Sequence, residues 1–163
     1  MMIRKNFVNV DKFKLWINNY ENLLVKEKWN GKENNSGRSC LWFGVGVNLG
    51  FKNDKFLGEN ISLGLKKRCS ELYGSEDWNS LLLYKYEIGS DLKDHVDRKC
   101  FDKKVVIVNI CDDDLFGNGI VKFRYNNEIE ILKNGEVVEI DSSKKHGVCK
   151  VEKIRYSLSI RKV

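Results

Sequence analysis

The chain has 163 residues, of which 42% are hydrophobic and 32% are charged, which is typical of one soluble globular domain. No apolar run approaches the roughly 20 residues of a membrane-spanning helix, and we expect no secretory signal. The five cysteines are scattered and odd in number, which argues against a disulfide framework. We therefore expect free thiols in a reducing, cytoplasmic compartment.

The net charge of +6 indicates an anionic partner, and nucleic acid is the obvious one. The alternative is that the protein is mildly basic without any binding role. We expect neither a membrane partner nor a disulfide-linked partner, and we expect a monomer.

The first half of the chain is predicted to form two helices, with a loop and a strand or hairpin between them. Helical spacing of apolar residues predicts a helix over 10–29, with Asp11 as its cap. Residues 30–37 are rich in polar residues and glycine and predict a mobile loop. Residues 38–49 are expected to form a strand or hairpin, and 59–73 a second helix.

From residue 78 onward, short β-prone runs alternate with turn residues. The expected strands are 81–88, 105–110, 120–125, 129–132, 137–140, 147–151 and 155–160. Residues 105–110 are apolar throughout, so we expect them to be buried on both faces. Asn134-Gly135 is a strong hairpin motif. We expect this hairpin to send the chain back across the sheet and to bring His146 close to His95 and Asp97.

This order predicts an α+β, mainly β protein, a double-stranded β-helix (jelly roll) with N-terminal flanking helices. We expect a single domain, 1–163. In it, 1–77 form helical support and a substrate lid, and 78–163 form the jelly-roll catalytic core.

The two histidines and one nearby carboxylate form a candidate metal site. His95 and Asp97 are two residues apart, so both side chains point to the same side of an extended segment. His146 must arrive from another strand. Two imidazoles and one carboxylate are the ligand set of a mononuclear non-haem Fe(II) site. The alternative is that each histidine is an ordinary structural residue.

The C-terminal run alternates, and its polar face carries Arg155, Ser157, Ser159 and Arg161. This face either lies in water or lines a cavity. In a cavity, an arginine offers a planar fork that binds a carboxylate through two hydrogen bonds.

Five separate elements occur in an order that resembles the AlkB-like 2-oxoglutarate/Fe(II) dioxygenases. They cover 78–163 and are Tyr86, His95-x-Asp97, Asn134-Gly135-Glu136-Val137-Val138, His146-Gly147-Val148 and Arg155-x-Ser157-x-x-x-Arg161. The resemblance implies that His95, Asp97 and His146 bind Fe(II). It also implies 2-oxoglutarate and O2 as co-substrates.

The resemblance further implies that Arg155 pairs with the 5-carboxylate of 2-oxoglutarate and that Arg161 lies near its 1-carboxylate and Asp97. Tyr86 would donate its hydroxyl to the co-substrate. Ser157 and Tyr84 stand where family members often have asparagine, and both are further candidates for the co-substrate site.

The leading hypothesis is oxidative demethylation or hydroxylation of a nucleic acid base, with release of succinate and CO2. Single-stranded or locally opened nucleic acid would be the partner, because a flipped base needs aromatic stacking. Candidate substrate contacts are Arg38, Trp42, Phe43, Arg98 and Lys99. Trp42 and Phe43 are alternatively core residues, and Arg98 and Lys99 are alternatively solvated.

The sequence leaves two other functions open. DNA-repair members carry an acidic residue after the aspartate, whereas this chain has Arg98 and Lys99. This departure permits an oxygenase that hydroxylates a protein side chain or a small molecule. The third hypothesis is a non-catalytic nucleic-acid-binding β domain that kept the scaffold.

Overall fold

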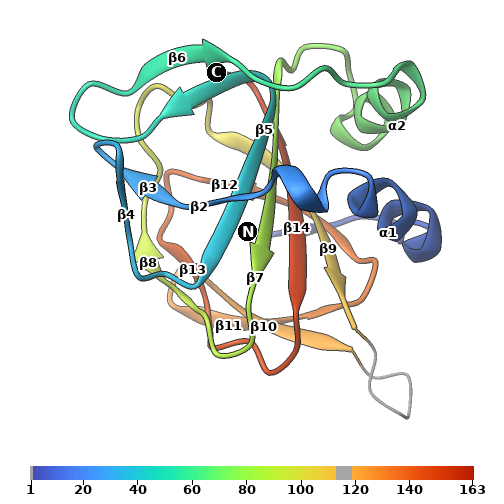
Figure 1. Cartoon of the computed structure of the whole chain (residues 1–163). Coiled ribbons are helices and arrows are strands. Elements are labelled where there is room, and N and C mark those ends of the chain that lie inside the picture. Colours follow the sequence, from blue (N-terminus) through green and yellow to red (C-terminus); the bar gives the residue numbers. More distant parts are fainter. Residues whose placement is uncertain (1, 113–118) are drawn as a thin grey trace.

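The computed structural model describes residues 2–112 and 119–163, which fold into two facing β-sheets with helices on one side (Figure 1). The major sheet contains, in spatial order, β1 (Ile3–Arg4), β12 (Val137–Asp141), β9 (Lys104–Cys111), β14 (Arg155–Arg161), β7 (Ser80–Tyr86), β5 (Arg38–Asn48) and β2 (Val25–Lys26), and β6 (Asp54–Leu57) pairs with β5. The minor sheet contains β11 (Glu128–Lys133), β10 (Ile120–Tyr125), β13 (His146–Val148) and β8 (Leu92–His95). A short separate ladder joins β3 (Lys28–Trp29) to β4 (Lys32–Glu33). The strands that pair within these sheets are antiparallel, and the predicted jelly roll is confirmed.

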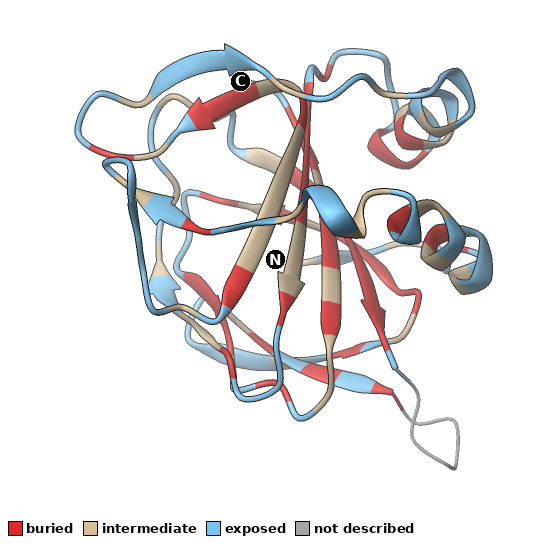
Figure 2. Cartoon of the chain, in the orientation of Figure 1, coloured by how far each residue is buried: buried red, intermediate tan, exposed pale blue. Residues whose placement is uncertain are grey.

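Successive side chains of the central strands point to opposite faces of the major sheet, and both faces are apolar. The helices cover one face, and the minor sheet covers the other. On β9, Val106 and Val108 pack with the helices, whereas Val105 and Ile107 pack with the minor sheet. As expected for residues 105–110, this strand is buried on both faces. In Figure 2, buried segments lie along the central strands, and the outer sides of the helices are exposed.

The helices are shorter than the apolar spacing predicts. Helix α1 is Val10–Asn18, and Asn9, not Asp11, caps it by accepting a hydrogen bond from the Lys12 N–H at 3.1 Å. After α1 comes a 3-10 turn, η1 (Glu21–Leu23), and then β2 pairs with β5. Pairing with the sheet outweighs the helical spacing here, and the asparagines around the helix end favour termination.

The second helix, α2 (Leu63–Tyr73), begins four residues after its expected start. Ser62 caps it by accepting a hydrogen bond from the Leu65 N–H at 3.4 Å. Gly74, at φ 90°, ends it in the left-handed conformation that glycine adopts without steric cost. Strand β5, expected as a strand or hairpin, lies within the major sheet, so residues 1–77 contribute strands as well as helices.

The expected hairpin at Asn134-Gly135 is wrong. Strand β11 pairs with β10 in the minor sheet, whereas β12 pairs with β9 in the major sheet. The turn therefore carries the chain from one sheet to the other. The tight hairpin lies at Asn126-Asn127, where φ angles of 51° and 68° match the two-residue turn that suits twisted strands.

Neither helix in the part of the chain that the structure describes is long and apolar enough to cross a membrane.

Candidate metal and carboxylate site

A cavity of about 870 Å³ lies between the two sheets and gathers most of the candidate residues. The polar face of β14 lines it, with Arg155, Ser157, Ser159 and Arg161. Of the two readings of this strand, the structure shows the cavity-lining one. The other predicted site residues that line it are Arg38, Trp42, Tyr84, Tyr86, His95, Asp97, Arg98, Lys99 and His146.

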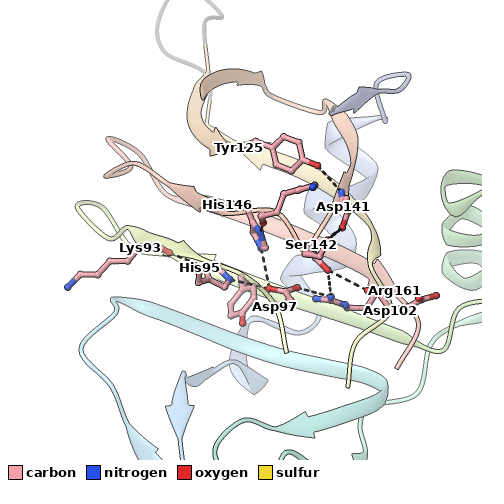
Figure 3. Close-up of polar contacts among 12 residues, drawn as sticks. Lys93, His95, Asp97, Asp102, Tyr125, Asp141, Ser142, His146 and Arg161 are labelled. Carbon is pink, nitrogen blue, oxygen red and sulfur yellow. Dashed lines mark hydrogen bonds and ion pairs between the residues drawn. The ribbon is translucent and has the colours of Figure 1, made fainter. Parts of the chain in front are cut away.

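His95, Asp97 and His146 converge at one point of this cavity (Figure 3). His95 ends β8 and His146 begins β13, and the register places them directly opposite each other across the ladder. Their ring centroids are 4.4 Å apart. The Nε2 atoms of both rings lie 3.2 Å from Oδ1 of Asp97, so three ligand atoms face one position.

Backbone carbonyls orient both imidazole rings. Nδ1 of His95 lies 3.0 Å from the Lys93 carbonyl oxygen, and Nδ1 of His146 lies 2.8 Å from that of Lys144. A carbonyl only accepts, so each Nδ1 is the donor to its carbonyl, and Nε2 is the ring nitrogen directed at Asp97. When both Nε2 atoms offer their lone pairs, these and the carboxylate oxygen face one another, an arrangement that a shared cation stabilises. The donor set therefore fits Fe(II).

Asp97 is held from both its backbone and its side chain. Its N–H donates to the Ser142 carbonyl at 3.0 Å, and its Oδ2 accepts from Nη2 of Arg161 at 2.7 Å. Burial alone would raise the pKa of Asp97, but hydrogen bonds with His146 and His95 and the charge of Arg161 lower that pKa far below its usual range. Asp97 is thus ionised at neutral pH, as a metal ligand must be.

Gly147 allows β13 to lie close to β8 beside the candidate metal ligands. A Cβ at this position would lie 2.6 Å from both the Leu92 carbonyl and Oδ1 of Asp94. The glycine after His146 is therefore required by the close approach of the two histidine strands.

We expect the affinity of the site for Mn(II) to fall at acidic pH, because both imidazoles must be neutral to bind metal. Burial alone lowers the pKa of His95, but hydrogen bonds with Asp97 and the Lys93 carbonyl raise it overall. Protons therefore compete with metal as pH falls through this raised pKa, costing up to about tenfold in affinity per pH unit for each proton displaced. Isothermal titration with Mn(II) from about pH 8 to about pH 5 measures this, and a pH-independent affinity would contradict it.

Three buried guanidiniums surround the cavity, and they differ in their partners. Arg38 pairs with Glu27, and Arg161 pairs with Asp97. No carboxylate among residues 2–112 and 119–163 forms an ion pair with Arg155, although Arg155 is only 1% exposed. A buried charge without an opposite charge is costly, which makes Arg155 a candidate receptor for an anionic ligand.

The Arg155 side chain is held in place from two sides. Its Nε donates to Oδ1 of Asn109 at 2.7 Å, and its Cζ lies 4.7 Å from the centre of the Tyr86 ring. Burial lowers the pKa of Arg155, but an arginine remains protonated in proteins. This fixed planar cation fits a carboxylate.

The structure does not leave Arg38 free to bind substrate. Its Nε donates to Oε2 of Glu27 at 3.0 Å, and its Nη1 donates to the Tyr86 hydroxyl at 3.2 Å. Its Cζ lies 4.2 Å from the centre of the Tyr84 ring. Because the Tyr86 oxygen accepts from Arg38, its own O–H remains available to donate to a ligand.

We expect Glu27→Gln to destabilise the fold by about 3 kcal/mol, because it leaves the buried Arg38 charge without a carboxylate. Urea unfolding measures the loss, with the exposed Glu33→Gln as a matched control. The double variant Glu27→Leu/Arg38→Met should recover most of the stability, since it removes both charges. Equal stability of Glu27→Gln and wild type would show that the pair contributes nothing.

Trp42 and Phe43 are neighbours on β5 and point to opposite faces of the sheet. Trp42 lines the cavity, whereas Phe43 is 0% exposed and contacts Trp16 and Tyr20 of the helical layer. Phe43 as a substrate contact is therefore a wrong prediction, because strand alternation places it in the core.

Arg98 and Lys99 are exposed residues that line the cavity, and Arg98 stacks over Trp29 with its Cζ 4.4 Å from the ring centre.

Three residues in or beside this site are not predicted from the sequence. Glu27 lies between two lysines, and nothing in that run distinguishes it. Phe101 lies under Arg161, whose Cζ is 4.0 Å from the ring centre. Asn109 is the one residue with a usable signal, because it is a polar residue inside an otherwise apolar strand.

No protein-family model matches the sequence, and no curated protein is similar to it in sequence. The structure is similar to a Pseudomonas putida prolyl-4-hydroxylase, with a TM-score of 0.66 and 12% identity, covering 98% of this chain and 91% of that one. It is also similar to a Trichoplax adhaerens prolyl hydroxylase solved with a peptide fragment of the hypoxia inducible factor oxygen degradation domain. There the TM-score is 0.60 at 12% identity, over 99% of this chain and 81% of that one. At this identity the likeness establishes the shared fold, and the AlkB-like resemblance is not confirmed.

Proposed function

We propose that the protein is an Fe(II)- and 2-oxoglutarate-dependent dioxygenase. The observation that carries this is the shared cavity of a His-Asp-His triad and a buried arginine that forms no ion pair with any carboxylate in the described part of the chain. A metal and a carboxylate receptor in one cavity suit a ligand that binds metal at one end and carries a carboxylate at the other. The jelly-roll neighbours, which are 2-oxoglutarate/Fe(II) oxygenases, support the proposal.

Each residue then has a physical task. His95, Asp97 and His146 would hold the iron, and the two backbone carbonyls behind the histidines keep both Nε2 atoms directed at it. Arg155 would bind the distal carboxylate of 2-oxoglutarate, and Tyr86 would donate its hydroxyl to the co-substrate. Arg161 keeps Asp97 ionised and oriented. Iron with 2-oxoglutarate and O2 supplies the oxidising chemistry, in which decarboxylation to succinate and CO2 accompanies oxidation of a substrate C–H bond.

Anaerobic titration with Fe(II) and 2-oxoglutarate tests this proposal most directly. We expect 2-oxoglutarate to bind tightly only after metal, and we expect succinate when O2 is admitted. Failure of 2-oxoglutarate to bind the metal-loaded protein would overturn the co-substrate assignment. If 2-oxoglutarate binds but no succinate forms with either methylated oligonucleotides or proline-containing peptides, the non-catalytic alternative is favoured.

For the substrate we propose a nucleic acid base, in line with the AlkB-like resemblance. The net charge of +6 and the exposed Arg98 and Lys99 beside the cavity favour a polyanion. Trp42 and Phe101 line the same cavity with parallel ring planes, 1° apart in orientation and 6.3 Å between centroids. Aromatic faces of this kind stack with bases.

A polypeptide side chain is the second candidate, and one observation favours it. The likeness to the prolyl hydroxylases extends over 98% and 99% of this chain, so it includes the segments around the cavity as well as the core. One of those proteins was solved with a bound peptide fragment.

The two candidates are separated by a parallel screen. Methylated single-stranded oligonucleotides are assayed for formaldehyde, and peptides that contain proline are assayed for a mass gain of one oxygen. A nucleic acid substrate should also show binding that weakens steeply with salt. Peptide oxidation with no salt-sensitive oligonucleotide binding would replace the first candidate by the second.

A further inference from the structure

Asn109 is a polar residue on the inward face of β9, where it lies directly behind Arg155. The other residues on this face, Val105, Ile107 and Cys111, belong to the apolar cluster between the sheets. Asn109 is 0% exposed. A buried carboxamide is costly unless its donor and its acceptor are both satisfied.

Both ends of the Asn109 side chain have partners, and they fix its orientation. Oδ1 accepts from Nε of Arg155 at 2.7 Å, and Nδ2 donates to the Lys133 carbonyl oxygen at 3.0 Å. Because the Arg155 Nε–H can only donate and the Lys133 carbonyl can only accept, a flipped carboxamide would lose both hydrogen bonds.

The backbone of Asn109 is tied to the turn that joins the two sheets. Its N–H donates to the Glu136 carbonyl at 2.9 Å, and its carbonyl accepts from the Gly135 N–H at 2.7 Å. The turn is therefore braced on β9 next to the carboxamide. Asn109 is a fixed point from which the Arg155 guanidinium can be oriented.

The contact with Asn109 occupies Nε, a nitrogen that a carboxylate bound end-on to the two terminal nitrogens does not need. With Nε bound and the guanidinium lying against the Tyr86 ring, the plane of the group cannot turn freely. Arg155 lines the cavity beside Tyr86, so an anion in the cavity can meet the end of the guanidinium that faces away from Asn109. A preorganised fork binds a carboxylate more tightly than a mobile one.

We propose that Asn109 is a positioning residue that orients the Arg155 guanidinium for the distal carboxylate of the co-substrate. This inference rests on the proposed function. Asn109 lies on a different strand and sheet from both histidines, so its role can be separated from metal binding.

The test compares Asn109→Leu with the exposed Asn60→Leu as a matched control. We expect Asn109→Leu to weaken binding of 2-oxoglutarate to the Mn(II)-loaded protein by about 10- to 100-fold, with unchanged Mn(II) affinity. A parallel loss of Mn(II) affinity would indicate a merely structural role and would overturn the proposal, as would unchanged 2-oxoglutarate affinity.

A second measurement observes Arg155 itself. In the wild type, the Arg155 Nε–H resonance, identified by its loss in Arg155→Lys, should exchange slowly with water, and in Asn109→Leu it should exchange fast. Slow exchange in the variant would overturn the proposal. If the wild type does not bind 2-oxoglutarate, the proposed function fails, whereas the exchange rate still decides whether Asn109 orients Arg155.

Asn109→Asp covers the case in which the leucine variant does not fold. It keeps an acceptor for Nε but places a carboxylate on the guanidinium. We expect slow exchange of the Arg155 Nε–H together with weaker 2-oxoglutarate binding, because the new carboxylate competes for the charge. Unchanged 2-oxoglutarate affinity in this variant would overturn the proposal.

Discussion

His146→Ala is expected to lower 2-oxoglutarate-dependent succinate formation by roughly 1,000-fold or more, because it removes one of the three proposed metal ligands. Loss of a residue that merely supports a ligand typically costs about 10- to 100-fold in metal affinity or activity, and loss of the ligand itself should cost more. The chain has only two histidines, so no other imidazole can replace His146 opposite His95. Succinate release under saturating Fe(II) measures the effect.

Lys145→Ala is the matched control for this variant, since it changes the preceding, exposed residue of the same segment. It should retain wild-type activity. Retained turnover in His146→Ala, with metal bound as in the wild type, would show that the metal lies elsewhere and would end the triad assignment.

Arg155→Leu is expected to weaken 2-oxoglutarate binding by roughly 30- to 3,000-fold while leaving Mn(II) affinity unchanged. Removing one partner of a buried, hydrogen-bonded charge pair costs about 2–5 kcal/mol. Leucine removes the buried charge and places no new polar group between β9 and β14, so we expect the fold to persist. Titration of the Mn(II)-loaded protein with 2-oxoglutarate gives the affinity directly.

Arg68→Leu makes the same change on the surface of α2, where the arginine side chain is 41% exposed, and controls for the loss of one positive charge. Arg155→Lys should fall between wild type and Arg155→Leu, because lysine keeps the charge but loses the planar fork. Equal affinity of Arg155→Leu and wild type for 2-oxoglutarate would remove the observation on which the proposed function depends.

The sequence predicts the metal cluster better than its surroundings, for reasons of residue chemistry. His95 and Asp97 must share a side in an extended segment, and only one other histidine exists to join them. Polar and apolar residues alternate along β14, and this pattern also predicts the polar face of the strand. Alternation could not say whether that face meets water or a cavity, because this depends on a second sheet that the local pattern does not describe.

The missed features depend on contacts between distant segments. Adjacent aromatic residues such as Trp42 and Phe43 must point to opposite faces, but the pattern does not tell which face is the cavity. Both Asn134-Gly135 and Asn126-Asn127 are turn sequences, and the local signal cannot tell which sheet the next strand joins. Helix α1 ends early because β2 pairs with β5, a contact between segments that are not adjacent in sequence.

Under the proposed function, the division of the site between two sheets has a consequence for which diacids bind. The histidines belong to β8 and β13 of one sheet, whereas Arg155 belongs to β14 of the other. The separation of the two sheets therefore fixes the distance between the metal position and the Arg155 guanidinium, and so selects the length of the diacid. A four-carbon or six-carbon 2-oxo diacid should bind less tightly than the five-carbon homologue, because the sheets would have to slide or separate to seat both ends.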